Sequence, residues 1–311
     1  MLIKYNIEDV KLLVEIDEKM GVIDFYDTLR REIGCGWDRI TSVSYLHDIE
    51  TYRKAKELSV IIPKMDLKEF KSVDGADVEL LKTGLFFYTI YFDIKSQYGS
   101  GIMLCNISPE TLDNFGEIML DLHLRFKNNK KGIIPQIIEQ EIKRRDEVKR
   151  QMFEELKLNG KSEKYQSLNK IQVSLKILPA SWYGLFNTEY YCLKDRRLTE
   201  AITTFSRKSI NWSKNIVEKN GYDVIAIDTD GMFINSKSTT KEETIILGKQ
   251  IKSLINESYK DFLKELGVNS GELQIKFEGI FKSFFIGSKK HYFGNLIYQE
   301  GQEVDEMIIK G

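Results

Sequence analysis

The sequence predicts an α+β fold, and three observations point to that class. Residues 224–227 form a short apolar run followed by Asp228-Thr229-Asp230-Gly231 and a second apolar stretch, which predicts a tight β-hairpin with acids at its tip. Residues 84–93 are rich in aromatic and β-branched side chains, which favour a buried strand. Long segments with apolar residues at helical spacing separate these strands along the chain.

The composition is typical of a globular protein. The chain has 311 residues, of which 42% are hydrophobic and 30% charged, enough for one large domain or two smaller ones. No apolar run approaches the ~20 residues that span a membrane, and the first residues lack the pattern of a signal peptide. Three cysteines without metal-type spacing indicate a reducing compartment, so we expect a cytoplasmic location. A net charge of -1 leaves any nucleic-acid binding to local patches.

Residues 1–65 are expected to be mostly helical, with irregular connections. Asp48 and Glu50 are two close carboxylates in this region. Such a pair can bind a metal, but on a surface helix it more often forms a solvated face. The strand over residues 84–93 then delivers Asp93 to its end, where residues 94–103 turn into a helix.

Two long helices are expected in the middle of the chain. Residues 135–158 form a charged helix with Pro135 in its first turn. Arg145 and Lys149 are four residues apart and project from one face, and a solubilising surface is the alternative role for them. A second helix over residues 167–186 forms an antiparallel hairpin with the first. It carries Lys176, Ser181, Tyr183 and Gly184.

The last third of the chain alternates helices and strands. A helix over residues 195–219 ends near Gly221, and another over residues 241–266 ends at Gly267. No repeat or low-complexity linker separates the segments, so we expect them to interleave into one body. Strands are predicted for residues 273–278, 282–286 and 289–298.

Four short motifs follow one another along the chain. They are Asp93-Ile-Lys-Ser-Gln-Tyr-Gly-Ser with Asn106-Ile-Ser-Pro-Glu-Thr, then Lys176-Ile-Leu-Pro-Ala-Ser-Trp-Tyr-Gly184, Asp228-Thr-Asp-Gly231 and Lys289-Lys-His-Tyr292. In this order they resemble the first palm motif, the fingers motif Lys-x-x-x-Asn-Ser-x-Tyr-Gly, the second palm motif and the duplex-contacting Lys-Lys-x-Tyr motif of family B DNA polymerases of the archaeal or viral type. Order and spacing match through most of the chain.

The resemblance implies a two-metal site for Mg²⁺, with Mn²⁺ as a possible substitute. Asp93 and Asp230 match the two bridging carboxylates, and the backbone carbonyl of Ile94 matches a further ligand. Asp228 matches the more weakly engaged acid, and Glu278 is expected nearby.

The resemblance also implies how nucleotide and DNA are bound. Arg145, Lys149 and Lys176 match the cations that face the triphosphate of an incoming dNTP. Tyr98 matches the steric gate against a ribose 2′-hydroxyl, and Tyr183 matches the residue under the nascent base pair. Contacts with the primer-template backbone are expected from Lys289, Tyr292 and Gly184.

The sequence departs from the family pattern at several positions. Pro179-Ala180 replaces Ala-Asn in the fingers motif, and a proline inside a helix costs ~3 kcal/mol or more, so we expect a bent helix. Gly99 replaces the proline after the steric gate. Tyr5-x-x-x-Asp9 resembles the third motif of the proofreading exonuclease, whose earlier motifs are absent, and the thumb is expected to be missing as well.

The organisation implied by the resemblance is a palm of antiparallel strands backed by helices, with a helical-hairpin fingers insertion. Residues 1–50 would be an exonuclease-domain remnant, 51–124 and 187–311 the palm, and 125–186 the fingers. The chain would be the catalytic core of a split DNA polymerase, and a companion polypeptide would carry thumb or exonuclease segments. Its location would be the cytoplasm, or the cytoplasm of a virus-infected host cell. The alternative is a catalytically degenerate palm that serves as a scaffold for DNA or replication proteins.

Overall fold

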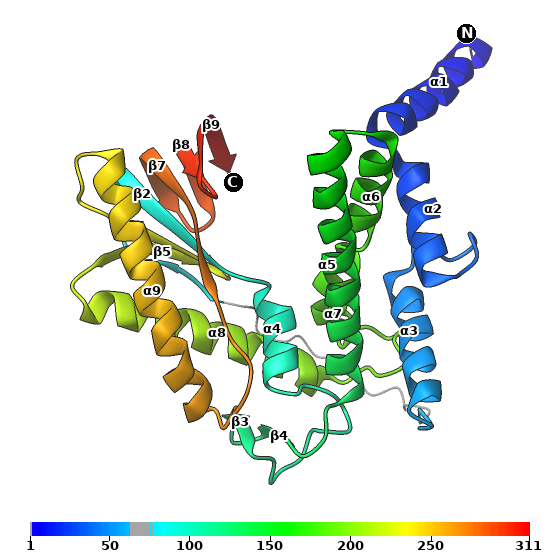
Figure 1. Cartoon of the computed structure of the whole chain (residues 1–311), viewed down its shortest axis with the longest axis horizontal. Coiled ribbons are helices and arrows are strands. Elements are labelled where there is room, and N and C mark those ends of the chain that lie inside the picture. Colours follow the sequence, from blue (N-terminus) through cyan, green and yellow to red (C-terminus); the bar gives the residue numbers. More distant parts are fainter. Residues whose placement is uncertain (1, 63–74, 76) are drawn as a thin grey trace. The chain divides into compact units, whose positions relative to one another are not determined.

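The chain divides into two compact units. The computed structural model describes residues 2–62, 75 and 77–311. Unit 1 consists of Met1–Glu69 and Ile133–Lys194, and unit 2 of Phe70–Gly132 and Asp195–Gly311 (Figure 1). Among the described residues, no helix combines the length and the apolar character needed to cross a membrane.

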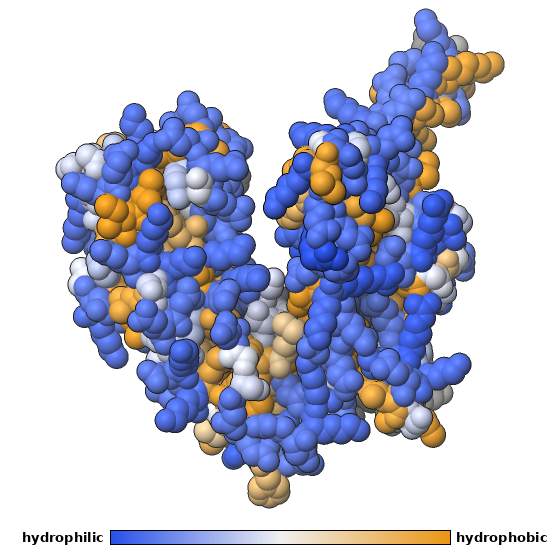
Figure 2. All heavy atoms as spheres, viewed as in Figure 1, coloured by the Kyte–Doolittle hydropathy of each residue, from blue (hydrophilic) through white to orange (hydrophobic). Residues whose placement is uncertain are grey.

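Unit 1 is helical wherever regular structure is described. Its core joins α2, α3 and the junction between α6 and α7 through Leu29, Ile33, Leu46, Leu175 and Leu178. The helix α1 has no buried residue, and hydrophobic side chains lie on its face visible at the upper right of Figure 2. The helices are α1 (Leu2–Met20), α2 (Val22–Ile33), α3 (Val43–Glu57), α5 (Ile133–Asn159), α6 (Glu163–Ser174) and α7 (Ile177–Leu185).

The single helix expected over residues 167–186 is wrong, because two helices occupy this segment. Helix α6 ends at Ser174, and α7 begins at Ile177. Pro179 has no N–H to donate to the carbonyl four residues earlier, that of Leu175. The proline therefore lies in the first turn of a new helix, where a backbone N–H has no intrahelical partner in any case.

Unit 2 is built on a seven-stranded sheet in which all neighbouring strands are antiparallel. The strand order is β1-β5-β6-β2-β7-β8-β9. This sheet, together with separate helices, confirms the α+β class. The strands are β1 (Val78–Leu80), β5 (Asp223–Asp228), β6 (Gly231–Asn235), β2 (Gly84–Ile94), β7 (Ile275–Ser288), β8 (His291–Gln299) and β9 (Gln302–Lys310).

Helices cover one face of this sheet. Helix α9 (Lys241–Glu265) packs there, with Gly248 so close to Phe277 that a Cβ would lie 2.8 Å from the ring. Phe92, the register partner of Phe277, is fully buried, as are Ile90 and Ile94. Tyr91 and Asp93 alternate with these residues and lie on the opposite face. The remaining elements are α8 (Arg196–Lys219), α4 (Gln97–Leu104), and the β3 (Ile118–Asp121) and β4 (Leu124–Phe126) hairpin.

The C-terminal strands differ from the sequence prediction, whereas the helix ends confirm it. Gly221 and Gly267 have φ of 81° and 80° and follow the ends of α8 and α9. The strands predicted at 273–278 and 282–286 are one continuous strand, β7, whose register shifts several times against β2 and β8. These bulges break the two-residue alternation that sequence reasoning relies on. The edge strand β9, which is largely exposed, was not predicted.

Candidate active site

The β5–β6 hairpin fixes the position of its acidic turn. Asp228 pairs with Gly231, so Thr229 and Asp230 form a two-residue turn. Thr229 adopts the left-handed conformation with φ of 66°. The Ile94 N–H donates to the Asp230 carbonyl at 2.9 Å, which fastens the turn to the end of β2. The two acidic motifs, distant in sequence, therefore meet at one end of the sheet.

Asp93 lies at that same end, between two neighbouring strands. Its register partners are Gly231 on β6 and Lys276 on β7. Burial, followed by the negative charges of Asp230 and Glu278, raises the pKa of Asp93 to about 7. Charges affect one another in this way only at short range. Asp93, Asp230 and Glu278 thus form one acidic cluster in unit 2.

A β-bulge brings Glu278 into this cluster. Tyr91 pairs with Gly279, whereas Phe92 pairs with Phe277, so Glu278 is the extra residue on β7. A bulge re-aims the side chain of its extra residue. The family resemblance implied only that Glu278 lies near the site, since no sequence pattern marks a bulge between strands so far apart in the chain.

Tyr91 is a residue of the site that the sequence did not identify. Its hydroxyl donates to Asp93 Oδ1 at 3.4 Å, and its ring stacks on Phe233 with centroids 4.8 Å apart. A Cβ at Gly231 would lie 2.8 Å from the Tyr91 ring. The left-handed residue is Thr229, and glycine is required at 231 by the space that Tyr91 occupies.

Two lysines hold Asp228, Lys290 from the Lys-Lys-x-Tyr motif and Lys310 from β9. Lys290 Nζ lies 3.1 Å from one carboxylate oxygen, and Lys310 Nζ lies 3.7 Å from the other. Burial raises the pKa of Asp230, the Asp228 carboxylate adds to this effect, and the two lysines oppose it. Asp228 is thus engaged with cations of the chain itself. Lys310 lies in β9, so sequence reasoning that missed this strand also missed its role.

The residues expected to contact DNA differ in their surroundings. Lys289 is exposed in the two-residue turn between β7 and β8. Tyr292 is only 8% exposed, and its ring packs against Phe233 and Phe284. The Lys310 ammonium lies 5.7 Å from the centroid of the Tyr292 ring. The motif thus contributes an exposed cation and a core aromatic side chain to unit 2.

Tyr98, the residue expected as the steric gate, follows a residue that fixes the start of helix α4 in place. The buried Gln97 amide donates to the Ser206 carbonyl at 3.2 Å and to Ser209 Oγ at 3.1 Å, both on α8. Tyr98 is the next residue in α4 and is half-buried. The Gln97 bonds therefore fix the backbone from which Tyr98 projects.

The residues expected to bind the nucleotide belong to unit 1. Arg145 donates from Nε to the Gln172 carbonyl at 3.1 Å and from Nη2 to Gln172 Oε1 at 3.2 Å, which links α5 to α6. Lys176 is exposed just before α7. Lys149 and Tyr183 are half-buried in α5 and α7, and Gly184 is exposed.

The acidic pair near the start of the chain is not the solvated face that its spacing favoured. Asp48 accepts a hydrogen bond from the Cys192 N–H at 2.9 Å. Glu50 Oε2 is buried. Tyr5 and Asp9, by contrast, are exposed on α1.

Comparison with known proteins gives consistent matches. The family model described as DNA polymerase family B matches residues 49–311. A DNA polymerase of Desulfurococcus sp. (strain Tok) is 29% identical over 93% of this chain and 37% of its own length. The DNA polymerase delta catalytic subunit of Plasmodium falciparum is 30% identical over 99% of this chain and 29% of its own length. DNA polymerase II of Escherichia coli is 25% identical, and this chain spans 39% of its length.

Proposed function

The chain belongs to DNA polymerase family B, and we propose that it carries the nucleotidyl-transfer centre of a DNA-templated DNA polymerase. The observation that supports this most directly is the convergence of Asp93 and Asp230 at one end of the sheet, within the region that matches the family. The substrates would be primer-template DNA and dNTPs.

The acidic cluster fits a pair of divalent ions. Divalent ions, Mg²⁺ or in its place Mn²⁺, activate the attacking 3′-hydroxyl and stabilise the leaving pyrophosphate. Asp93 and Asp230 would each contribute a carboxylate, and Ile94 its carbonyl. The mutual repulsion that raises the pKa of Asp93 is the repulsion that bound cations would relieve. Asp228, already paired with Lys290 and Lys310, would be the more weakly engaged acid.

We assign the sheet of unit 2 to the palm and helices α5, α6 and α7 to the fingers. Arg145, Lys149 and Lys176 would attract the triphosphate, because cations on a helical hairpin suit a polyanion. Tyr98 would exclude the 2′-hydroxyl, and Tyr183 would pack under the nascent base pair. Contacts with the primer-template would come from Lys289 and Gly184. Tyr292, which is largely buried, would support this surface through its packing.

A companion polypeptide is the remaining part of this proposal. Residues 1–50 would join the palm and fingers to an exonuclease segment. Support comes from α1, where Leu2, Ile3, Leu13 and Met20 are each at least 67% exposed. Such apolar surface is typical of a helix that docks on another protein.

The second candidate is a scaffold that binds DNA or replication proteins without catalysis. It is favoured by Pro179-Ala180 in the fingers motif and by the engagement of Arg145 with Gln172. Single-nucleotide primer extension with Mg²⁺ separates the two candidates. We expect incorporation that is lost in Asp93→Asn and in Asp230→Asn but kept in Asp305→Asn, a matched change of an exposed acid on β9. DNA binding without metal-dependent extension would favour the scaffold, whereas full activity in both site variants would contradict the assignment of Asp93 and Asp230 as metal ligands.

A further inference from the structure

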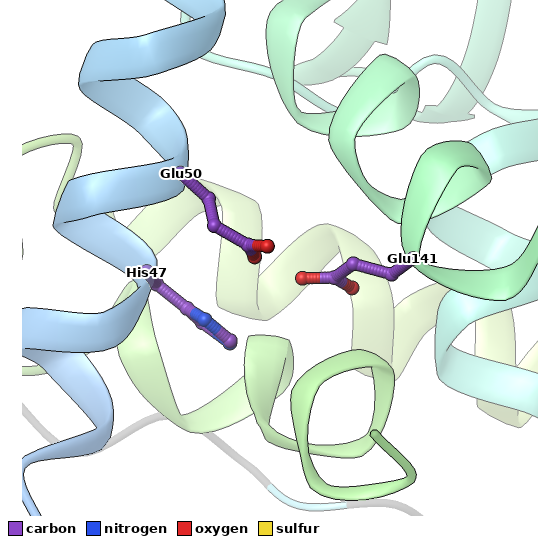
Figure 3. Close-up of side chains that lie close together, drawn as sticks. All are labelled: His47, Glu50 and Glu141. Atoms are coloured by element: carbon purple, nitrogen blue, oxygen red, sulfur yellow. The ribbon is translucent and has the colours of Figure 1, made fainter. Parts of the chain in front are cut away.

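A second cluster of potential metal ligands lies in unit 1. His47 and Glu50 project from α3, three residues apart, and Glu141 projects from α5 toward them (Figure 3). The His47 side chain is fully buried, and Glu141 is 4% exposed. No role in nucleotidyl transfer has been assigned to these residues above.

Within the part of the chain that the structure describes, one atom of each side chain is buried without a hydrogen-bond partner. These atoms are His47 Nδ1, Glu50 Oε2 and Glu141 Oε1. One ligand atom from each residue can be chosen so that all three lie within 4.8 Å of one another. Leaving a buried polar atom unsatisfied costs ~1–3 kcal/mol, so three together call for a common partner.

The hydrogen bond from Ser181 to the Leu178 carbonyl is compatible with a lone pair on His47 Nδ1. The Ser181 hydroxyl donates to the Leu178 carbonyl at 3.0 Å, so its oxygen accepts from His47 Nε2–H at 2.9 Å. In this arrangement the proton of the neutral ring is on Nε2, and Nδ1 is an acceptor. This is how a metal-binding histidine is usually oriented, with its other nitrogen donating to a fixed partner.

Glu141 is oriented by a comparable bond. Trp182 Nε1–H donates to Glu141 Oε2 at 2.9 Å, which leaves Oε1 for the cluster. The Trp182 ring also stacks on His47, with centroids 4.4 Å apart. Ser181 and Trp182, both in α7, thus orient the side chains of His47 and Glu141.

The cluster consists of three acceptors that face one another. With the ring proton on Nε2, a single proton between Glu50 and Glu141 would satisfy the two carboxylates but leave His47 Nδ1 without a donor. Two protons would be needed to satisfy all three, with both carboxyls neutral. One divalent cation satisfies all three acceptors at once and balances the two carboxylate charges.

We propose that His47, Glu50 and Glu141 bind one divalent first-row transition-metal ion, with Zn²⁺ as the reference ion. One imidazole and two carboxylates suit such an ion better than Mg²⁺, which prefers oxygen ligands alone. Two ligands of one ion at ~2.1 Å are at most ~4.2 Å apart, so a small rotation of the glutamates would close the site. The ion would join α3 to α5, with α7 as the support.

An entry path lies beside the cluster. Glu50 and Glu141 line a pocket of ≈ 240 Å³, together with Arg53 and Arg144. Arg144 Nη2 forms an ion pair with Glu32 Oε2 at 2.5 Å, and Arg53 Nη2 donates to the Gly34 carbonyl at 3.5 Å. Burial raises the pKa of Glu50, and the hydrogen bond with Glu141 and the two arginines oppose this effect in part.

The test is a Zn²⁺ titration of the chelator-treated full chain by calorimetry. The background carries Asp93→Asn and Asp230→Asn, so that the acidic cluster of unit 2 does not contribute. We expect one Zn²⁺ per chain, with affinity reduced at least ~10-fold in Glu50→Gln and in Glu141→Gln. The matched control is Glu200→Gln, which changes the exposed pair with His123 and should leave binding unchanged.

Thermal unfolding shows whether the variants fold and gives a second readout. Zn²⁺ should raise the unfolding temperature of the background and of the control but not that of Glu141→Gln. Co²⁺ in place of Zn²⁺ should give visible absorption that requires His47. The proposal would be overturned if Zn²⁺ bound no better to the background than to Glu141→Gln. A second outcome would also overturn it: Zn²⁺ does not change the unfolding temperature of the background, and metal-free Glu141→Gln is more stable than the metal-free background. A carboxyl pair that shares a proton predicts this outcome.

Discussion

The ionisation of Asp93 links the proposed chemistry to pH. A carboxylate binds a cation only when it is ionised, and the pKa of Asp93 is raised to about 7. At limiting Mg²⁺, we expect the apparent affinity for Mg²⁺ to fall about tenfold for each pH unit below that value. Glu278→Gln removes one of the neighbouring charges and should move this transition to lower pH.

The measurement is single-nucleotide incorporation against Mg²⁺ concentration across this pH range. Glu300→Gln is the matched control, because Glu300 is exposed and, like Glu278, lies 3.7 Å from Lys276. Coincident pH profiles for Glu278→Gln and the unchanged chain would contradict the assignment of Glu278 to the cluster.

The raised pKa of Asp93 has the opposite effect on folding stability, which it increases at low pH. In the metal-free chain, the folded state keeps the Asp93 proton up to about pH 7, whereas an unfolded Asp with its ordinary pKa of 3.8 releases it earlier. The contribution of Asp93 to folding stability therefore falls as pH rises from 3.8 to about 7 and is constant above. Added Mg²⁺ should offset this loss, which denaturant unfolding at several pH values would measure.

The contact between Gly231 and Tyr91 gives a prediction about the geometry of the site. Gly231→Ala places a methyl group 2.8 Å from the Tyr91 ring, which must move away from Asp93 and Phe233. We expect a loss of about 1–3 kcal/mol in the free energy of unfolding, together with weaker nucleotide incorporation. Gly75→Ala is the control, since none of the described residues lies within 4 Å of a Cβ there. Equal stability of the two variants would show that the Tyr91 ring is not fixed.

At the scale of elements, the sequence predicted local patterns well and long-range strand pairing poorly. The hairpin at Asp228 to Gly231, the strand ending at Asp93 and the helix ends at Gly221 and Gly267 are set by residues close in the chain. The bulge at Glu278 and the ion pairs of Lys290 and Lys310 depend on which strands pair. Pairing is decided by packing across the whole sheet, so one local pattern carries little information about it.

The acidic pair at Asp48 and Glu50 illustrates the same limit. Spacing alone favoured a solvated face, because most acids on helices are exposed. Burial of Glu50 depends on Glu141, which lies 91 residues later on α5. The signal that sequence reasoning lacked was the packing of α3 against α5 and α7.

The helical hairpin of α5 and α6 allows the two roles of Arg145 to be separated. Arg145→Ala removes both the bonds to Gln172 and a cation, whereas Gln172→Ala removes its own side-chain bond and keeps the cation. We expect both variants to lose about 1 kcal/mol of stability. Only Arg145→Ala should raise the KM for dNTPs in primer extension. An equal KM in the two variants would assign Arg145 to the hairpin alone.

At the scale of the whole molecule, the distribution of charge limits DNA affinity. Phosphate contacts dominate non-specific binding to DNA, and a net charge of -1 provides little long-range attraction. We therefore expect the chain alone to bind primer-template weakly and to extend primers distributively. Binding should weaken steeply between low and physiological salt, which a fluorescence titration would measure.

The exposed apolar residues of α1 give the last prediction, which concerns the companion polypeptide. If α1 docks on such a partner, adding a thumb- or exonuclease-containing chain in trans should increase the length of the extension products at physiological salt. Leu13→Ser with Ile16→Ser should abolish this gain, because both side chains are exposed and apolar on α1. Glu15→Ser with Glu18→Ser is the control on the same helix and should retain the gain. Processive synthesis by the chain alone at physiological salt, unaffected by the α1 variants, would refute the dependence on a partner.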